Sequence, residues 1–347
     1  MSDVVNIGGR AIGRGHPTFI IAEIGANFAT LAEARRQVDA AARAGCDAVK
    51  VQTFRADTLV RRDAMFTFED GTRVPQFDFF SQRELSRDLH VELNAYVAAT
   101  GMLFFSTPSH SADVDLLESI DTPVYKIGSD DLTNLPLLHD TARRGKPIIV
   151  STGMATMEEI DDAVSCVRAA GNEALILLHC VVGYPAPLRE ANLRMIAELQ
   201  HRFDVPVGFS DHTVGILAST LAVACGGCVI EKHFTLDRSP GGPDNDTALE
   251  PEEMKRLVDD VRTSEAALGS GEKRVTPGEM KWREAARKSL VAARDLRAGE
   301  RLTPIAIAVK RPADGLHPKH YASLVGRVLN TDVARDQSLT WDLLTDE

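Results

Sequence analysis

Short apolar runs recur along the first three quarters of the chain, and each is rich in Ile, Val, Leu or Phe. They are TFIIAEI, DAVKVQT, MLFFST, PVYKIG, PIIVST, ALILLHC, VGFSD and CVIEKHF. Between them lie longer segments of helical period, such as LAEARRQVDAAARAG, MEEIDDAVSCVRAAG and TVGILASTLAVACGG. Several of these segments stop at glycine, which helices commonly do. The pattern predicts eight strand-and-helix units in succession.

Strict alternation of strands and helices favours a parallel sheet with helices on its faces. Eight such units favour a closed (β/α)₈ TIM barrel over an open doubly wound sheet. No GxGxxG sequence follows the first strand, so nothing indicates a dinucleotide-binding fold. The last barrel helix is expected at 251–268.

The chain changes character after this helix. The segment SGEKRVTPGEMKWREAARKS is polar and charged, and short β-like runs with turns follow it. We therefore expect a TIM-barrel catalytic domain at 1–270, a linker at 271–287 and a small, mostly β domain at 288–347. A domain of this size is better suited to capping the barrel than to independent catalysis.

Composition narrows the classes of function. The 347 residues are 44% hydrophobic and 26% charged, and no apolar run is long enough to span a bilayer. The net charge of −11 argues against nucleic acid as a partner. The N-terminus lacks the features of a secretory signal, and the 5 cysteines are scattered, so a cytoplasmic location is expected.

Polar residues cluster at the predicted carboxyl ends of the strands, where TIM barrels place their active sites. Two pairs are spaced two apart, so each pair shares one face of a strand: Lys50 with Gln52, and Glu231 with His233. The residues at these ends are Glu23, Lys50, Gln52, Ser106, Thr107, Lys126, Ser129, Ser151, Thr152, His179, Ser210, His212, Glu231 and His233.

The two lysines, with hydroxyls and turn N–H groups around them, form a receptor for phosphate or carboxylate groups. A phosphate-bearing substrate suits Lys50 and Lys126. Either amine could alternatively form a Schiff base, as barrel aldolases do.

His212 and His233 end neighbouring strands, so both imidazoles could bind one divalent ion. Without a dense set of carboxylates or thiolates, the ion would be weakly held Mn²⁺, Mg²⁺ or Co²⁺ acting as a Lewis acid. The alternative is two histidines that hydrogen-bond to substrate or backbone. A zinc hydrolase fits less well, because the first strand reads AEIG instead of carrying a His-x-His pair.

Several of these residues lie in short motifs that resemble, in their order along the chain, the motifs of a known family. IIAEIGANF, VKVQTF, FFSTP, KIGSDDLTNLPLL, STGM, LLHCVVGYPAP, GFSDHT and EKHFTLDRSPGGPD resemble, in this order, the sialic acid synthase family. This family includes N-acetylneuraminate synthase and its legionaminic and pseudaminic acid relatives. The tail from KSLVAARDLRAGERLT onward is similar to the family's antifreeze-like (SAF) cap domain.

The resemblance implies a condensation of phosphoenolpyruvate with N-acetylmannosamine or a related amino sugar, releasing phosphate by C–O cleavage. The implied metal ligands are His212 and His233, with Mn²⁺ preferred over Mg²⁺ or Co²⁺. Glu23 and Asp131 would orient the water that adds to C2, and His233 belongs to the same catalytic group. The resemblance further implies phosphoenolpyruvate contacts from Lys50, Thr107, Lys126, Ser129, Ser151 and Ser210, and sugar contacts from Gln52, Tyr184, Asp244 and Arg311.

The sequence departs from the family at Asn27-Phe28-Ala29-Thr30, where a histidine and a glycine are missing, and at Ala313-Asp314 in the cap. One alternative is a legionaminic or pseudaminic acid synthase acting on a dideoxy-diacetamido hexose. Two others are a metal-dependent aldolase or hydrolase, and a binding protein on an inactive barrel. The resemblance also implies a homodimer in which one chain's cap closes the other's barrel.

Overall fold

The computed structural model describes residues 4–25, 28, 30–67, 71–241 and 243–345. The chain forms two compact units, Met1–Gly269 and Ser270–Glu347. Within the described ranges, no helix combines the length and apolarity needed to cross a membrane.

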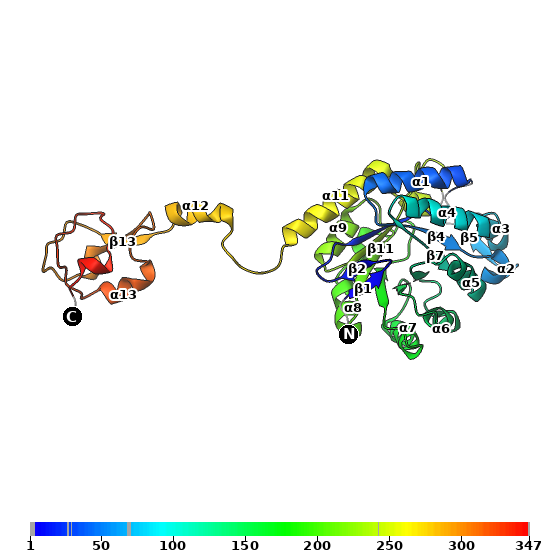
Figure 1. Cartoon of the computed structure of the whole chain (residues 1–347), viewed down its shortest axis with the longest axis horizontal. Helices are drawn as coiled ribbons and strands as arrows, with labels where there is room; N and C mark the ends of the chain where they lie inside the picture. Colours follow the sequence, from blue (N-terminus) through cyan, green and yellow to red (C-terminus); the bar gives the residue numbers. More distant parts are fainter. Residues whose placement is uncertain (1–3, 26–27, 29, 68–70, 242, 346–347) are drawn as a thin grey trace. The chain divides into compact units, whose positions relative to one another are not determined.

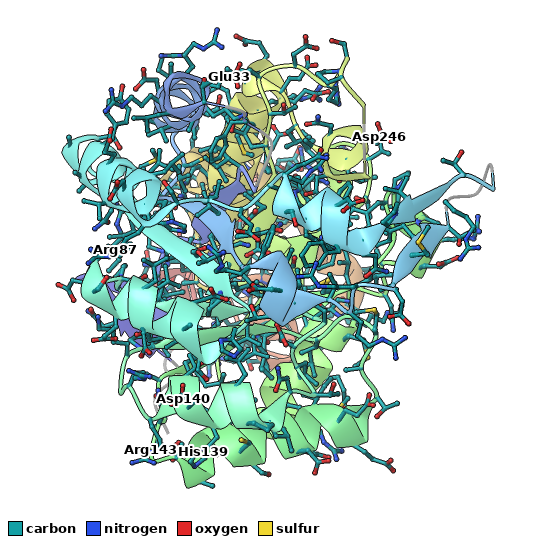
Figure 2. All side chains as sticks on the ribbon, turned by 90° about the vertical axis from the view of Figure 1, so that its right-hand side faces the viewer. Glu33, Arg87, His139, Asp140, Arg143 and Asp246 are labelled. Carbon is teal, nitrogen blue, oxygen red and sulfur yellow. The ribbon has the colours of Figure 1, made fainter. Side chains whose placement is uncertain are left out.

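A closed barrel of eight parallel strands forms the first unit, with the order β10-β11-β12-β3-β4-β7-β8-β9. Helices surround these strands, and the charged side chains labelled in Figure 2, such as Arg87 and Arg143, lie on the outer helical layer (Figures 1 and 2). The predicted (β/α)₈ barrel is confirmed. The strands are β3 (Phe19–Glu23), β4 (Ala48–Thr53), β7 (Leu103–Pro108), β8 (Tyr125–Ile127), β9 (Ile148–Ser151), β10 (Leu175–Cys180), β11 (Val207–Asp211) and β12 (Val229–His233).

One main helix follows each barrel strand, and its apolar face packs on the sheet in a continuous core. Helix α1 begins at the N-cap Thr30 and ends at Gly45, whose φ of 90° is the left-handed conformation that glycine tolerates. The helices are α1 (Leu31–Ala44), α4 (Arg87–Ala99), α5 (Ser111–Ser119), α6 (Leu135–Ala142), α7 (Met157–Ala169), α8 (Met195–Phe203), α9 (Leu217–Ala224) and α11 (Pro251–Leu268).

Additional elements decorate both ends of the barrel. The hairpin of β1 (Val4–Ile7) and β2 (Arg10–Gly13) contributes Ile7 and Ile12 to a core at the amino ends of the strands. An insertion after β4 carries α2 (Ala56–Leu59), β5 (Met65–Thr67), β6 (Arg73–Pro75) and α3 (Gln76–Ser81). A turn η1 (Leu188–Glu190) and a short helix α10 (Pro243–Thr247) complete the carboxyl side.

The second unit has its own apolar core, which includes Leu290, Leu302 and Leu339. Its two strands pair antiparallel, and isolated bridges tie the rest together, as expected for a small, mostly β domain. The segment predicted as a linker is partly helical, because Thr276 and Glu279 form a capping box that starts a helix. The elements are α12 (Pro277–Ala286), β13 (Ser289–Ala292), η2 (Pro304–Ala306), β14 (Ile307–Lys310), η3 (Pro318–His320), α13 (Tyr321–Leu324) and η4 (Trp341–Leu343).

Candidate active site at the carboxyl ends of the barrel strands

Lys50 on β4 is the first centre of the site. Its Nζ forms a close ion pair with Glu23 on β3 and donates a hydrogen bond to Thr107 Oγ1 at 2.9 Å. Burial alone would lower the pKa of Lys50, but the neighbouring carboxylates of Glu23 and Glu231 outweigh it and raise the pKa. The ammonium group is therefore charged and buried, with anionic partners inside the barrel mouth.

Lys126 on β8 is the second centre. Its Nζ donates to Ser151 Oγ at 2.6 Å and to the carbonyl of Ile127 at 3.0 Å. Burial lowers its pKa, and Glu231 opposes that shift. Both lysines thus present an amine to the same buried space, as predicted from the strand ends.

Glu231 lies between the two lysines, a role that was not predicted from the sequence. Its carboxylate lies 3.9 Å from Lys50 Nζ and 3.8 Å from Lys126 Nζ, and it accepts a hydrogen bond from Ser210 Oγ at 3.0 Å. Burial would raise its pKa, but the two lysines hold the pKa at about 2. The available signal was its position, two residues before His233 on the same strand face. We call Lys50, Thr107, Lys126, Ser151, Ser210 and Glu231 the lysine cluster.

Ser129 borders the lysine cluster at a tight corner. Its Oγ accepts a hydrogen bond from the backbone N–H of Gly153 at 3.0 Å. A Cβ added at Gly153 would lie 2.7 Å from Ser129 Oγ and 3.0 Å from Cys180 Sγ. Only glycine lets the backbone approach this closely, so the STGM turn needs its glycine for packing.

The two predicted metal ligands lie side by side. The rings of His212 and His233 have centroids 5.4 Å apart, and the Tyr184 ring lies 4.6 Å from that of His212. His212 Nδ1–H donates to the carbonyl of Val181 at 3.2 Å, which leaves the lone pair on Nε2, 3.3 Å from the Tyr184 hydroxyl. We call His212, His233, Tyr184 and Asp244 the histidine side.

These imidazoles suit a divalent ion in two respects. Both are uncharged, and each has a ring nitrogen available to bind the ion. Burial lowers the pKa of each histidine to about 4, so both are neutral near pH 7. Among the described residues, the buried Nδ1 of His233 has no hydrogen-bond partner. The described residues hold no group of three or more His, Cys, Asp or Glu suited to a metal. A two-histidine site that takes its other ligands from substrate and water matches this arrangement.

Two residues predicted to contact the sugar, Gln52 and Asp244, lie around Gly25 together with Glu23, which is predicted to orient water. A Cβ added there would lie 3.0 Å from Glu23 Oε1, 3.5 Å from Gln52 Nε2 and 3.6 Å from Asp244 Oδ2. Gln52 Nε2 also donates to Glu23 Oε1 at 3.5 Å. Gly25 has φ of 50°, which glycine adopts without strain. The turn after β3 therefore requires glycine here, because a side chain at this position would crowd Glu23.

Asp244 and Asp246 lie on the same short helix, α10, with different surroundings. Burial raises the pKa of Asp244, and the charges of His212 and Lys50 oppose that shift. Asp246 is exposed, and Figure 2 shows it on the outer surface. Of these two aspartates, only Asp244 interacts electrostatically with His212 and Lys50 at the barrel mouth.

Asp131 is not brought into these contacts. Its Oδ1 accepts a hydrogen bond from Asn134 Nδ2 at 2.9 Å, and within the described ranges no hydrogen bond or ion pair joins it to Glu23, either lysine or the histidines. Burial raises its pKa to about 6. Arg311 is exposed in the second unit.

The two departures from the family pattern have different outcomes. Asn27 and Ala29 lie outside the described residues. In the cap, Asp314 Oδ1 accepts hydrogen bonds from Ser289 Oγ at 3.2 Å and Ser338 Oγ at 2.5 Å, so this aspartate links two segments of the second unit.

Comparisons with known proteins identify the family of the chain. The NeuB family model matches residues 37–273, and the SAF domain model matches residues 287–345. The chain is 39% identical over 333 residues to the N,N'-diacetyllegionaminic acid synthase of Legionella pneumophila, covering 93% of this chain and 94% of that protein. It is 34% identical to the N-acetylneuraminate-9-phosphate synthase of Homo sapiens, covering 97% of this chain and 95% of that protein.

A solved structure gives the same result. The N-acetylneuraminic acid synthetase of Leptospira borgpetersenii superposes with a TM-score of 0.74 at 33% identity, covering 81% of this chain and 95% of that one. The family predicted from the motifs is confirmed, and this chain belongs to the NeuB family.

Proposed function

We propose that the chain condenses phosphoenolpyruvate with N-acetylmannosamine or a related amino sugar to give a nonulosonic acid and inorganic phosphate. The observation that carries the proposal is the meeting of two buried lysines and two neutral histidines at one barrel mouth. The lysines suit an anionic substrate, and the histidines suit an electrophile that needs polarising.

The lysine cluster binds phosphoenolpyruvate in this proposal. Lys50 and Lys126 lie 3.9 and 3.8 Å from Glu231, beyond hydrogen-bond distance, so each ammonium group can still donate to the phosphate or carboxylate of the substrate. Thr107, Ser129, Ser151 and Ser210 add hydroxyl donors and complete the anion receptor.

The histidine side binds the amino sugar in its open-chain form. A divalent ion held by His212 and His233, with Mn²⁺ preferred over Mg²⁺ or Co²⁺, would supply Lewis acidity to the sugar aldehyde. Tyr184, Gln52 and Asp244 bind sugar hydroxyls and orient the aldehyde carbon toward C3 of phosphoenolpyruvate.

Bond formation between C3 and the aldehyde carbon makes C2 oxocarbenium-like and leaves an alkoxide at the former aldehyde oxygen. Water then adds to C2, and Glu23, which lies against Lys50, holds that water, takes one of its protons and passes it on to the alkoxide. Breaking the C2–O bond releases phosphate, which carries away the proton of the C2 hydroxyl and leaves a ketone at C2. We assign Asp131 a secondary role in the same proton transfer, from its place in the motif.

The experiment is phosphate release with each substrate omitted in turn. Release that needs both phosphoenolpyruvate and an amino sugar supports the synthase, whereas sugar cleavage without phosphoenolpyruvate would support an aldolase or hydrolase. Borohydride added during turnover should leave no adduct on Lys126, because the proposal contains no Schiff base.

A dideoxy-diacetamido hexose is the second candidate acceptor. It is favoured by the identity to the legionaminic acid synthase, which exceeds that to the N-acetylneuraminate-9-phosphate synthase. Mass detection of the nonulosonate formed from a panel of hexosamines separates the two acceptors.

We propose further that the active form is a cytoplasmic homodimer in which one chain's second unit caps the partner's barrel, with Arg311 reaching the acceptor. Mixing Arg311→Ala with His233→Ala chains tests this arrangement. Capping in trans gives one intact site per mixed dimer and restores activity; capping in cis leaves every site defective.

A further inference from the structure

The two histidines belong to matched tripeptides on neighbouring strands. Ser210 and Asp211 end β11 and His212 follows directly, whereas Glu231-Lys232-His233 ends β12. The ladder pairs Ser210 with Glu231 and Asp211 with Lys232, and each histidine is the next residue along its segment. The two segments therefore present three successive residue pairs, which are two ladder pairs and then the two histidines.

The first pair, Ser210 and Glu231, and the third pair, His212 and His233, face the barrel mouth. Ser210 Oγ donates to Glu231 Oε1 at 3.0 Å, and the rings of His212 and His233 lie 5.4 Å apart. Successive side chains of a strand point to opposite faces, so the middle pair faces the surrounding helices. A hydrogen bond agrees with this: Asp211 Oδ2 accepts from Ser219 Oγ on α9 at 2.6 Å.

The middle pair is a fully buried ion pair. Lys232 Nζ lies 3.1 Å from Asp211 Oδ2, and both side chains are 0% exposed. Asp211 Oδ1 accepts from the backbone N–H of Thr213 at 2.8 Å, and Lys232 Nζ donates to the Thr213 carbonyl. The pair thus holds both backbone groups of the residue that directly follows His212.

Burial of two charges is a poor route to stability, because an apolar pair of similar volume is often as stable or more so. Fixing register is the best-attested use of such a group. Register is decisive here, since a slip of one residue would turn the histidine of the shifted segment away from the mouth and separate it from the other histidine.

We propose that Asp211 and Lys232 are positioning residues for the two-histidine metal site. They lock the register of β11 against β12 and the turn at Thr213, and so hold both imidazoles toward one ion. This inference rests on the proposed metal role of His212 and His233.

The test is Co²⁺ binding by the full chain, followed through the visible absorption of the bound ion. The double variant Asp211→Asn/Lys232→Met removes both charges, while asparagine keeps its oxygen toward the N–H of Thr213 and can donate from its amide nitrogen to Ser219 Oγ. We expect 10- to 100-fold weaker Co²⁺ affinity, the range found when partners of metal ligands are lost, with circular dichroism unchanged. Saturating Co²⁺ should restore turnover.

A matched control lies at the opposite end of the barrel. Arg262 NH2 pairs with Asp47 Oδ2 at 3.2 Å, away from the mouth. Arg262→Met removes that ion pair and should leave Co²⁺ affinity unchanged. If the double variant does not fold, Ser219→Ala replaces it: Asp211 keeps Lys232 but loses one hydrogen bond, and we expect roughly 3-fold weaker affinity.

The possible results distinguish a failure of the positioning role of Asp211 and Lys232 from a failure of the proposed metal site. Affinity within 2-fold of wild type in the folded double variant, or in Ser219→Ala when that variant is the one measured, overturns the positioning role alone. A wild-type chain that binds no Co²⁺ overturns the metal site and the positioning role together, and it leaves the phosphoenolpyruvate assignment to its own test.

Discussion

The lysine cluster and the histidine side meet at one barrel mouth but are built differently. In the lysine cluster, every residue lies on a barrel strand, and each lysine contacts a hydroxyl of a neighbouring strand and lies 3.9 Å (Lys50) or 3.8 Å (Lys126) from the Glu231 carboxylate on β12. On the histidine side, Tyr184 and Asp244 come from segments that follow the strands, and His233 Nδ1 has no partner among the described residues. The strands thus fix the anion receptor, whereas loops and bound groups complete the acceptor side.

The difference explains what the sequence reveals about each substrate. A receptor built on strands leaves regular signals at strand ends, and a family shares that scaffold. Loops vary in length and sequence without disturbing the barrel, so acceptor choice varies among similar chains. The relatives accordingly carry the names of different sugar acid synthases.

The largest expected effect comes from the lysine cluster. Lys126→Met should lower kcat/KM for phosphoenolpyruvate by about 10³-fold, because it removes a buried cation that binds the charged group. The KM for the sugar should change much less. Steady-state kinetics with each substrate varied measures both values.

Lys146→Met is the matched control. Lys146 forms ion pairs with Asp121 and Glu118 just before β9, at the amino end of the barrel, and its loss should leave both KM values unchanged. Equal losses for both substrates in Lys126→Met would contradict a division of the mouth between them.

Glu231 should dominate the acid stability of the lysine cluster. Its pKa of about 2 lies below the ordinary value of 4.5, so its contribution is complete above pH 4.5 and is lost as the pH falls toward 2. The contribution is about 3 kcal/mol at neutral pH. Glu231→Gln should therefore lower the free energy of unfolding at pH 7 and flatten its decline between pH 4.5 and 2.

Urea unfolding at each pH measures this difference. An equal decline in both proteins over that range would contradict the placement of an ionised Glu231 between the lysines.

On the acceptor side, Asp244→Asn should raise the KM for the sugar by about 10-fold, because a charged hydrogen-bond partner is lost. The KM for phosphoenolpyruvate should not change. Asp246→Asn on the same helix is the control, since Asp246 is exposed, and it should behave as wild type. Similar effects from both substitutions would show that α10 acts through its fold and not through one carboxylate.

The stability of the chain should depend on Asp131 in the direction opposite to that for Glu231. Burial raises its pKa to about 6, so the folded state favours the protonated acid and loses stability as the pH rises from about 4 through 6. Asp131→Asn should be more stable than wild type at pH 8 and equally stable near pH 4. Melting temperatures at both pH values test this; a variant less stable at pH 8 would contradict the direction of the shift.

Much of the barrel could be predicted from the sequence because apolar runs and helical periods are local signals. The ends of the strands placed Lys50, Lys126 and His233 correctly at the mouth. Helix α9 begins at Leu217, later than its apolar period suggested, because Asp211 binds the N–H of Thr213 and Gly215 adopts φ of 75°. Helix α12 was missed although its Thr276 to Glu279 capping box is a local signal.

Other features could be recognised only in the folded structure. The role of Glu231 depends on lysines from two other strands, and the Asp211–Lys232 pair depends on the register of β11 and β12. Neither relation is visible along a single strand. The β5–β6 hairpin was missed because its strands are three residues each, too short for a periodic pattern.

The central claim is that this barrel mouth joins phosphoenolpyruvate to an amino sugar with loss of phosphate through C–O cleavage. Its most direct test uses phosphoenolpyruvate labelled with ¹⁸O at the oxygen between C2 and phosphorus, together with the accepted amino sugar. We predict that mass spectrometry finds the label in the released inorganic phosphate and none in the nonulosonic acid. Label retained at C2 of the sugar acid would mean P–O cleavage and would contradict the account.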